Sequence, residues 1–118
     1  MPTEQPHLRF NDIVQNIDLI ESYLAELGDR PFAQVPLVRD AVERCLARIS
    51  EAAVKLGPSA EELAPSIAWQ NIRSFGNHLR HAYDQIDSGI VLDTIEVELP
   101  KLKESCIEAI RQLKNNCA

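Results

Sequence analysis

The sequence predicts an all-α protein, an antiparallel bundle of four long helices with one short helical turn. Apolar residues recur every three or four positions along four segments, and no segment alternates apolar and polar residues as a half-buried strand does. Aromatic residues (5%) and glycines (4) are scarce, which favours packed helices over a β-sandwich or barrel. Short connections place consecutive helices antiparallel, and we expect residues 1–118 to form one domain.

Two long helices are expected in the first half of the chain. Residues 10–27 form the first, which Gly28 ends. Residues 38–56 form the second, and the pair at 57–58, Gly-Pro, ends it. Residues 31–36 connect the two. The apolar stripes are Phe10, Ile13, Ile17, Ile20, Leu24 and Leu27 in the first helix, and Val38, Val42, Cys45, Ile49, Ala52 and Leu56 in the second.

A short helical turn and a third long helix are expected next. The turn covers residues 59–63, with Ser59 as N-cap and Glu62 three residues later, which is the spacing of a capping box. Pro65 and Ser66 open the third helix, and residues 87–89 end it. Its apolar stripe consists of Ala68, Ile72, Phe75, Leu79, Ala82 and Ile86.

The fourth long helix is expected along residues 91–113. Pro100 lies in its middle and has no backbone N–H, so the helix should kink or restart there. The stripe consists of Val91, Ile95, Leu99, Leu102, Cys106, Ile110 and Leu113.

Composition and cysteine usage indicate a cytosolic protein. No apolar run approaches the length of a membrane span, and the N-terminus does not read as a signal peptide. The cysteines are odd in number and widely spaced, so we expect Cys45 and Cys106 to be small core residues, Cys117 to lie in a frayed tail, and no structural disulfide. The net charge of −6 disfavours nucleic acid as a partner unless a local basic site exists.

Such a local site is found in residues 69–83, WQNIRSFGNHLRHAY. No Asp or Glu occurs between Glu62 and Asp84, although the chain holds 18 acidic residues. The simplest interpretation of its polar half is a solvated face, but the absence of acids suits a phosphate group. Gly76, in mid-helix, costs about 1 kcal/mol relative to Ala and is typical of close approach by another chain or a ligand. The polar half gathers Arg73, Asn77, Arg80 and His81.

These side chains suggest metal-free cleavage of RNA. His81 can remove the proton of a 2′-hydroxyl, and a guanidinium can hold the phosphate while charge builds on it. DNA lacks that hydroxyl and should resist. His78 and His81 are three residues apart, but no H-E-x-x-H pattern or matching Cys/His pair supports a metal, so we expect neither metal nor cofactor.

At these residues the chain resembles the HepT-like family of HEPN domains, ribonuclease toxins paired with MntA-type nucleotidyltransferase antitoxins. The family pattern is R-N-x-x-x-H-x-Y, preceded by a tryptophan, and Trp69, Asn77, His81 and Tyr83 fall in register with it. The similarity also covers LRFNDIVQNIDLIESYL, AVERCLARISEAAVKL, PSIAW and VLDTIEVELPKLKE.

The resemblance implies an all-α homodimer in which the third-helix faces of two protomers form a shared cleft. It also implies RNA cleavage, with tRNA as target, His81 as the base and Asn77 in support. AMP transfer to Tyr83 by the antitoxin would silence the protein. The chain departs from the family at Gly76, which replaces the motif arginine, so Arg80 or Arg73 would have to supply the guanidinium.

Three hypotheses therefore stand. The first is the toxin ribonuclease of a toxin–antitoxin pair. The second is a catalytically degenerate HEPN module that binds the nucleotidyltransferase partner, a nucleotide or an RNA without cleaving RNA. The third is a structural dimerising bundle whose polar face is solvated. Under all three, the edge formed by Gly76 and Tyr83 is the expected dimer contact.

Overall fold

The computed structural model describes residues 4–81 and 88–116. These residues form α1 (Pro6–Ala25), the 3-10 turn η1 (Phe32–Gln34), α2 (Pro36–Leu56), α3 (Pro58–Leu63), α4 (Trp69–His81) and α5 (Ser88–Asn116). No strand occurs in these two stretches, so the predicted all-α class is confirmed.

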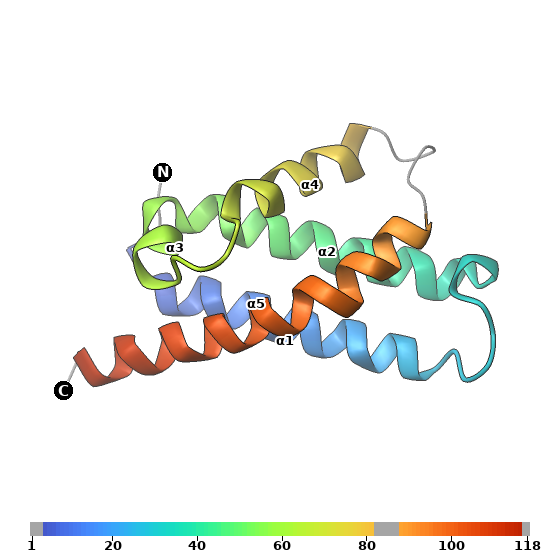
Figure 1. Ribbon diagram of the computed structural model, residues 1–118, viewed down its shortest axis with the longest axis horizontal. Helices are drawn as coiled ribbons and strands as arrows, with labels where there is room; N and C mark the ends of the chain where they lie inside the picture. Colours follow the sequence, from blue (N-terminus) through green and yellow to red (C-terminus); the bar gives the residue numbers. More distant parts are fainter. Residues whose placement is uncertain (1–3, 82–87, 117–118) are drawn as a thin grey trace.

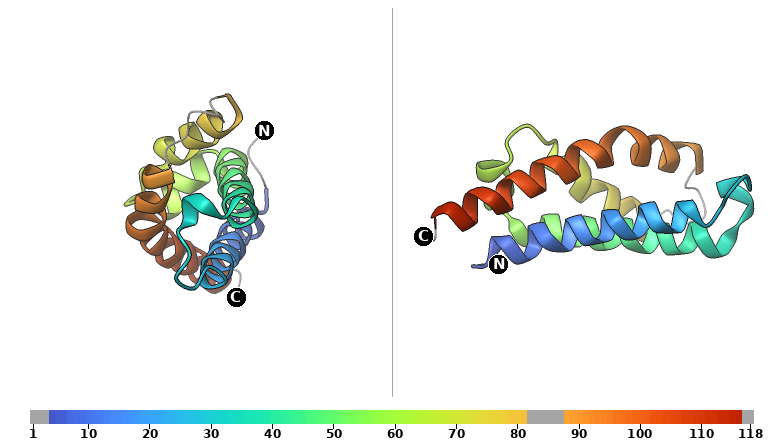
Figure 2. Two further views of the ribbon diagram at one scale, coloured as in Figure 1. Left: turned by 90° about the vertical axis from the view of Figure 1, so that its right-hand side faces the viewer. Right: turned by 90° about the horizontal axis from the view of Figure 1, so that it is seen from below.

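Consecutive long helices run antiparallel (Figure 1). α2 packs against α1 on one side and α4 on another, α5 packs on α1, and α3 touches α2. The end-on view in Figure 2 shows the helices around a common interior. The molecule measures 48 × 29 × 20 Å, and its long axis is close to the span of about 44 Å expected of the 29-residue α5.

The predicted apolar stripes form most of the core. The side chains predicted for α1 and α2 are buried, except that Leu24 is half-buried. In α5 the stripe is buried from Val91 to Cys106 and half-buried at Ile110 and Leu113. Cys45 and Cys106 are free thiols within this core, as predicted. The periodicity of apolar residues therefore located the three longest helices and the faces that they bury.

The predicted starts of α3 and α4 were wrong, and α1, α2 and α5 begin two to four residues before their first predicted stripe residue. α3 begins at Pro58, one residue before the expected start, and Ser59 makes no capping hydrogen bond because it already lies inside the first turn. Proline at the first helical position has its φ angle set for a helix and needs no N–H partner there. Gly57 precedes it with φ 56°, a backbone conformation that favours glycine.

α4 begins at Trp69 and not at residues 65–66. The chain turns before it, with the Ile67 N–H bonded to the Ala64 carbonyl and the Trp69 N–H bonded to the Ile67 carbonyl. As a result Trp69 is buried and Ala68 is exposed, the reverse of the predicted stripe. The predicted core positions 82 and 86 lie outside the described residues.

We expected a kink or a restart at Pro100; α5 continues through Pro100 as one helix, so the restart does not occur. Pro100 is exposed while Leu99 and Leu102 on either side are buried against the bundle. Water can therefore satisfy the carbonyl that loses its partner, and packing on α1 keeps the helix whole. No helix in the described part of the chain is long and apolar enough to cross a membrane.

Candidate functional site on helix α4

Trp69 anchors the start of α4. Its indole is buried, and the indole N–H donates to the Ala64 carbonyl at 2.8 Å. The ring also meets Phe10 of α1 edge to face, with centroids 6.2 Å apart and planes inclined by 65°. These contacts fix the N-terminal end of α4 to the connection before it and to α1.

The side chain of Arg73, one turn later, is held by hydrogen bonds to α2 and α3. Its Nη1 and Nη2 donate to the two carboxylate oxygens of Glu61 on α3 at 2.9 and 2.8 Å. Its Nε donates to the Ala53 carbonyl at 3.2 Å, and Nη2 donates to the Gly57 carbonyl at 3.0 Å, both at the C-terminal end of α2. These four bonds occupy four of the five N–H donors of the guanidinium.

The expectation that Arg73 lies on a free polar face was therefore wrong. Its side chain is only 16% exposed, and Glu61, which pairs with it, comes from just before the segment that lacks acids. The hydrogen bonds from Arg73 lower the pKa of the Glu61 carboxyl, and the same bonds raise the pKa of Arg73. The buried hydroxyl of Ser50 on α2 adds a bond to the Arg73 carbonyl at 3.2 Å.

The exposed face of α4 carries Asn77. Asn77 and His81 are four residues apart, so they are neighbours along one row of the helix. Arg80 belongs to a different row, one turn after Gly76. Gly76 is buried by the chain itself, so it does not form the free edge expected for a dimer contact. Tyr83, the predicted AMP acceptor, lies outside the described residues.

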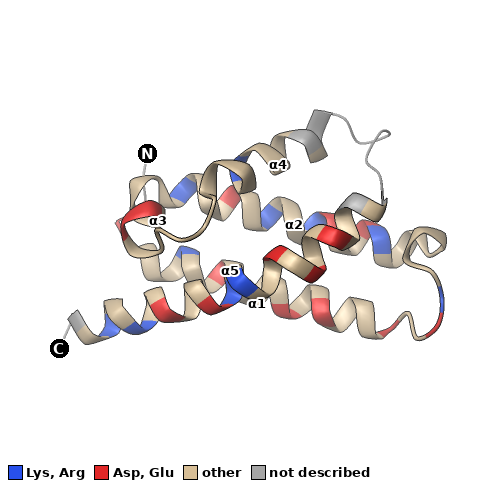
Figure 3. Cartoon of the chain, viewed as in Figure 1, with Lys and Arg blue, Asp and Glu red and all other residues tan. Residues whose placement is uncertain are grey.

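Residues 69–81 of α4 contain no acid, whereas acidic residues recur along α1, α2 and α5 (Figure 3). Because Arg73 is already paired with Glu61, its positive charge is not available to a ligand on this helix. The sequence counted Arg73 among the free cations of this face, whereas the structure pairs it with Glu61.

A hollow of about 460 Å³ lies between α4 and α5, a feature that the sequence did not reveal. Leu46, Ile49, Ile72, Phe75 and Leu99 contribute apolar lining. Ile72 and Phe75 belong to the predicted core stripe but are only half-buried. The physical reason is that α4 packs mainly on α2 and α5 mainly on α1, so that this flank of α4 stays open.

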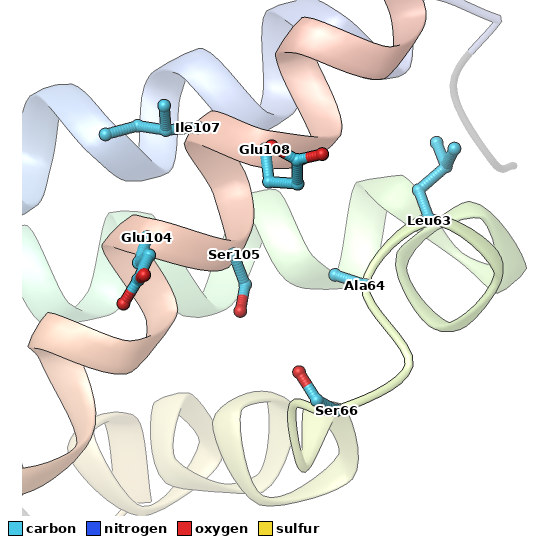
Figure 4. Close-up of a pocket in the computed structure, with 7 residues that line it drawn as sticks. All are labelled: Leu63, Ala64, Ser66, Glu104, Ser105, Ile107 and Glu108. Carbon is cyan, nitrogen blue, oxygen red and sulfur yellow. The ribbon is translucent and has the colours of Figure 1, made fainter.

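A second hollow, of about 420 Å³, lies between the α3–α4 connection and α5 (Figure 4). The carboxylates of Glu104 and Glu108 line it together with Ser66 and Ser105. Two carboxylates repel a phosphate, so this hollow does not suit nucleic acid. Across residues 4–81 and 88–116, no three His, Cys, Asp or Glu side chains come together as metal ligands would.

The fold is thus a helical bundle in which one face of α4 is polar and free of acids. Comparison with known proteins shows which family has this kind of bundle. The model of the HepT-like ribonuclease family matches residues 13–112. The chain belongs to the HepT-like ribonuclease family.

Individual relatives agree with this family. A Thermococcus cleftensis protein named as a probable ribonuclease HepT is 30% identical over 92 residues, covering 78% of this chain and 84% of that one. A candidate RNase of Methanocaldococcus jannaschii is 26% identical over 97% of this chain and 98% of its own length.

A second M. jannaschii protein, named as a gamma-glutamylcyclotransferase and candidate RNase, is 28% identical over 90% of this chain. The match spans only 48% of that relative, about half of its length. No solved structure gives a significant match to the chain.

Proposed function

We propose that this chain is a metal-independent endoribonuclease whose active site is the exposed face of α4. The observation that carries the proposal is the family match over residues 13–112, which includes α4 and the helices that hold it. Asn77 is exposed and lies one turn before His81 on the same row of the helix, which suits a shared substrate.

The proposed reaction uses groups that the chain and the RNA supply. The His81 imidazole removes the proton of a 2′-hydroxyl, and the 2′ oxygen then forms a bond to the adjacent phosphorus. The bond from phosphorus to the 5′ oxygen breaks, and the 5′ oxygen takes a proton from water. One product ends in a 2′,3′-cyclic phosphate and the other begins with a 5′-hydroxyl. Asn77 supports the site by hydrogen bonding to the substrate.

Arg80 is the proposed phosphate-binding residue. The sequence left Arg80 and Arg73 open as substitutes for the motif arginine that Gly76 replaces. Four hydrogen bonds hold Arg73 inside the fold, which favours Arg80. Arg80 also continues the row of Gly76 one turn later, about 6 Å along the helix axis. A guanidinium there can hold the phosphate as negative charge builds on it.

The family resemblance extends the proposal to substrate and control. tRNA is the proposed target, and a nucleotidyltransferase antitoxin is the proposed partner, which transfers AMP to Tyr83. The added AMP places a bulky anion where an RNA phosphate must come. The protein acts as a homodimer in this proposal, with two α4 faces forming a shared cleft. The half-buried Ile72 and Phe75 on the flank of α4 offer apolar surface for that contact.

A second candidate function is that of a catalytically degenerate HEPN module, which binds the nucleotidyltransferase partner or a nucleotide without cleaving RNA. The replacement of the motif arginine by Gly76 favours it. The two candidates differ in one measurable property, since both bind the partner but only the ribonuclease shortens RNA.

The test incubates purified protein in EDTA with total tRNA and with DNA of matched length. We expect cleavage of RNA alone, its loss in His81→Ala and its retention in His7→Ala. His7 is a suitable control because it is an exposed histidine on α1. Cleavage that persists in His81→Ala would refute the proposed active site. Intact RNA with the parent protein would leave the binding module as the better account.

A further inference from the structure

Three segments that are separate in the sequence meet at Arg73. They are the C-terminal end of α2 (residues 50–57), α3 with Glu61, and α4 with Arg73 itself. We refer to the paired side chains of Glu61 and Arg73 as the Glu61–Arg73 clasp. A bidentate guanidinium–carboxylate pair fixes the relative orientation of its two partners more closely than a single bond would.

The clasp also joins α4 to a helix end. The Ala53 and Gly57 carbonyls lie at the C-terminal end of α2, where the helix dipole is negative and favours a cation. The Ser50 hydroxyl bonds the Arg73 backbone from the same helix. Contacts of both the side chain and the main chain of Arg73 therefore set how α4 lies on α2.

Beyond Arg73, packing holds α4 in the bundle, with Gly76 and Leu79 buried. The helix packs mainly on α2, and its flank toward α5 borders the open hollow. From Arg73, Asn77 lies about 6 Å and His81 about 12 Å farther along the helix axis. A tilt of about 10° at Arg73 would move the backbone of His81 by about 2 Å, and misplacement by about 1 Å can cost 100-fold in rate.

We propose that Glu61 and Arg73 are positioning residues, which hold α4 at the tilt that presents Asn77, Arg80 and His81 to RNA. The inference rests on the proposed function for its catalytic consequence. In this proposal Arg73 positions α4 and does not bind phosphate. α3 contributes to the site because it carries Glu61, the partner of Arg73. The lowered pKa of Glu61 agrees with a carboxylate that stays ionised and paired at neutral pH.

One substitution distinguishes two possible roles of Arg73, because it should change RNA cleavage under one role and RNA binding under the other. If the clasp positions α4, Glu61→Gln weakens it and slows cleavage. If Arg73 instead binds RNA phosphate in competition with Glu61, the same substitution frees the guanidinium and tightens RNA binding. Glu62→Gln is a matched control, because it removes the same charge from the next, exposed position of α3.

The experiment measures kcat and KM for RNA cleavage at a temperature where circular dichroism shows each variant folded. We expect Glu61→Gln to lower kcat by about 10-fold or more and to change KM by less than about 2-fold. Arg73→Lys should behave alike, since an ammonium cannot make the bidentate pair and both carbonyl bonds. Glu62→Gln should match the parent. A lower KM or unchanged kcat in Glu61→Gln would overturn the proposal.

Hydrogen exchange of the α4 amides gives a second readout that needs no activity. Glu61→Gln should speed exchange in residues 74–81 and leave α1 unchanged, whereas Glu62→Gln should change neither. If the parent does not cleave RNA, the proposed function is wrong. Hydrogen exchange then still tests whether the Glu61–Arg73 clasp positions α4. Unchanged exchange in α4 would show that the clasp does not position the helix.

Discussion

Replacement of Trp69 by phenylalanine should destabilise the protein by an amount that the structure lets us estimate. The substitution keeps an aromatic ring against Phe10 but removes the N–H that donates to the Ala64 carbonyl at 2.8 Å. Ala64 is 4% exposed, so water has little access to the carbonyl that loses this donor. The Ala64 carbonyl keeps one longer bond from the Ile67 N–H, so losing the indole donor costs about 0.5–1.5 kcal/mol, and the smaller ring adds about 1 kcal/mol for the space it leaves.

The total of about 1.5–2.5 kcal/mol is a sizeable part of the roughly 6–18 kcal/mol expected for 118 residues. At a slope of about 2 kcal/mol per M of urea, the unfolding midpoint should fall by about 1 M. Circular dichroism is the appropriate probe because Trp69 is the only tryptophan, and its fluorescence is lost with it. Gln70→Ala, at the exposed next position, should shift the midpoint little. A shift below about 0.3 M in Trp69→Phe would refute the argument that this residue anchors α4.

Four further predictions follow from contacts of single residues. The hydrogen bonds from Arg73 lower the pKa of the Glu61 carboxyl below its ordinary value. The stabilisation from Glu61 is therefore complete above the pKa of the unfolded chain and is lost as the pH falls through the lower pKa of the folded protein. The difference in thermal midpoint between the parent and Glu61→Gln should therefore shrink between pH 5 and pH 3, a range conventional for carboxyl titration, and a constant difference would contradict the pairing. Burial raises the pKa of the Cys106 thiol to about 12, so mass mapping should find it unalkylated at neutral pH in folded protein and alkylated in denaturant. Gly76→Arg restores the family motif residue at a buried position, so it should destabilise by at least about 1–3 kcal/mol in urea titrations and should not raise RNA cleavage. Lys103→Gln removes ion pairs to α1 at 2.7 and 3.6 Å, and its small loss of stability should diminish at high salt.

The long helices were predictable because each is specified by its own residues. Repeated spacing of apolar side chains located α1, α2 and α5, and burial in the structure follows these stripes closely. The starts of the two shorter helices were not predicted. α3 begins at Pro58 and not at the serine beside it, and α4 begins at Trp69, after turns that the local pattern does not show.

The candidate site was predictable only in part. The helical wheel correctly made Asn77 exposed, because that property depends on α4 alone. It misplaced Arg73, because the partners of that side chain belong to α2 and α3. One available signal was Glu61, an acid placed shortly before a long segment without acids. The hollow between α4 and α5 could not have been foreseen, because it depends on which pairs of helices pack together.

The central claim is that RNA is cut by its own 2′-hydroxyl, with His81 on α4 as the base. The most direct test maps the cleavage site in a defined tRNA and then replaces that one 2′-hydroxyl by hydrogen. The account predicts that the substituted RNA stays intact in EDTA at that position, while the unmodified RNA gives a 2′,3′-cyclic phosphate end that His81→Ala does not produce. Cleavage of the substituted RNA at the same bond, leaving a 5′-phosphate, would contradict it.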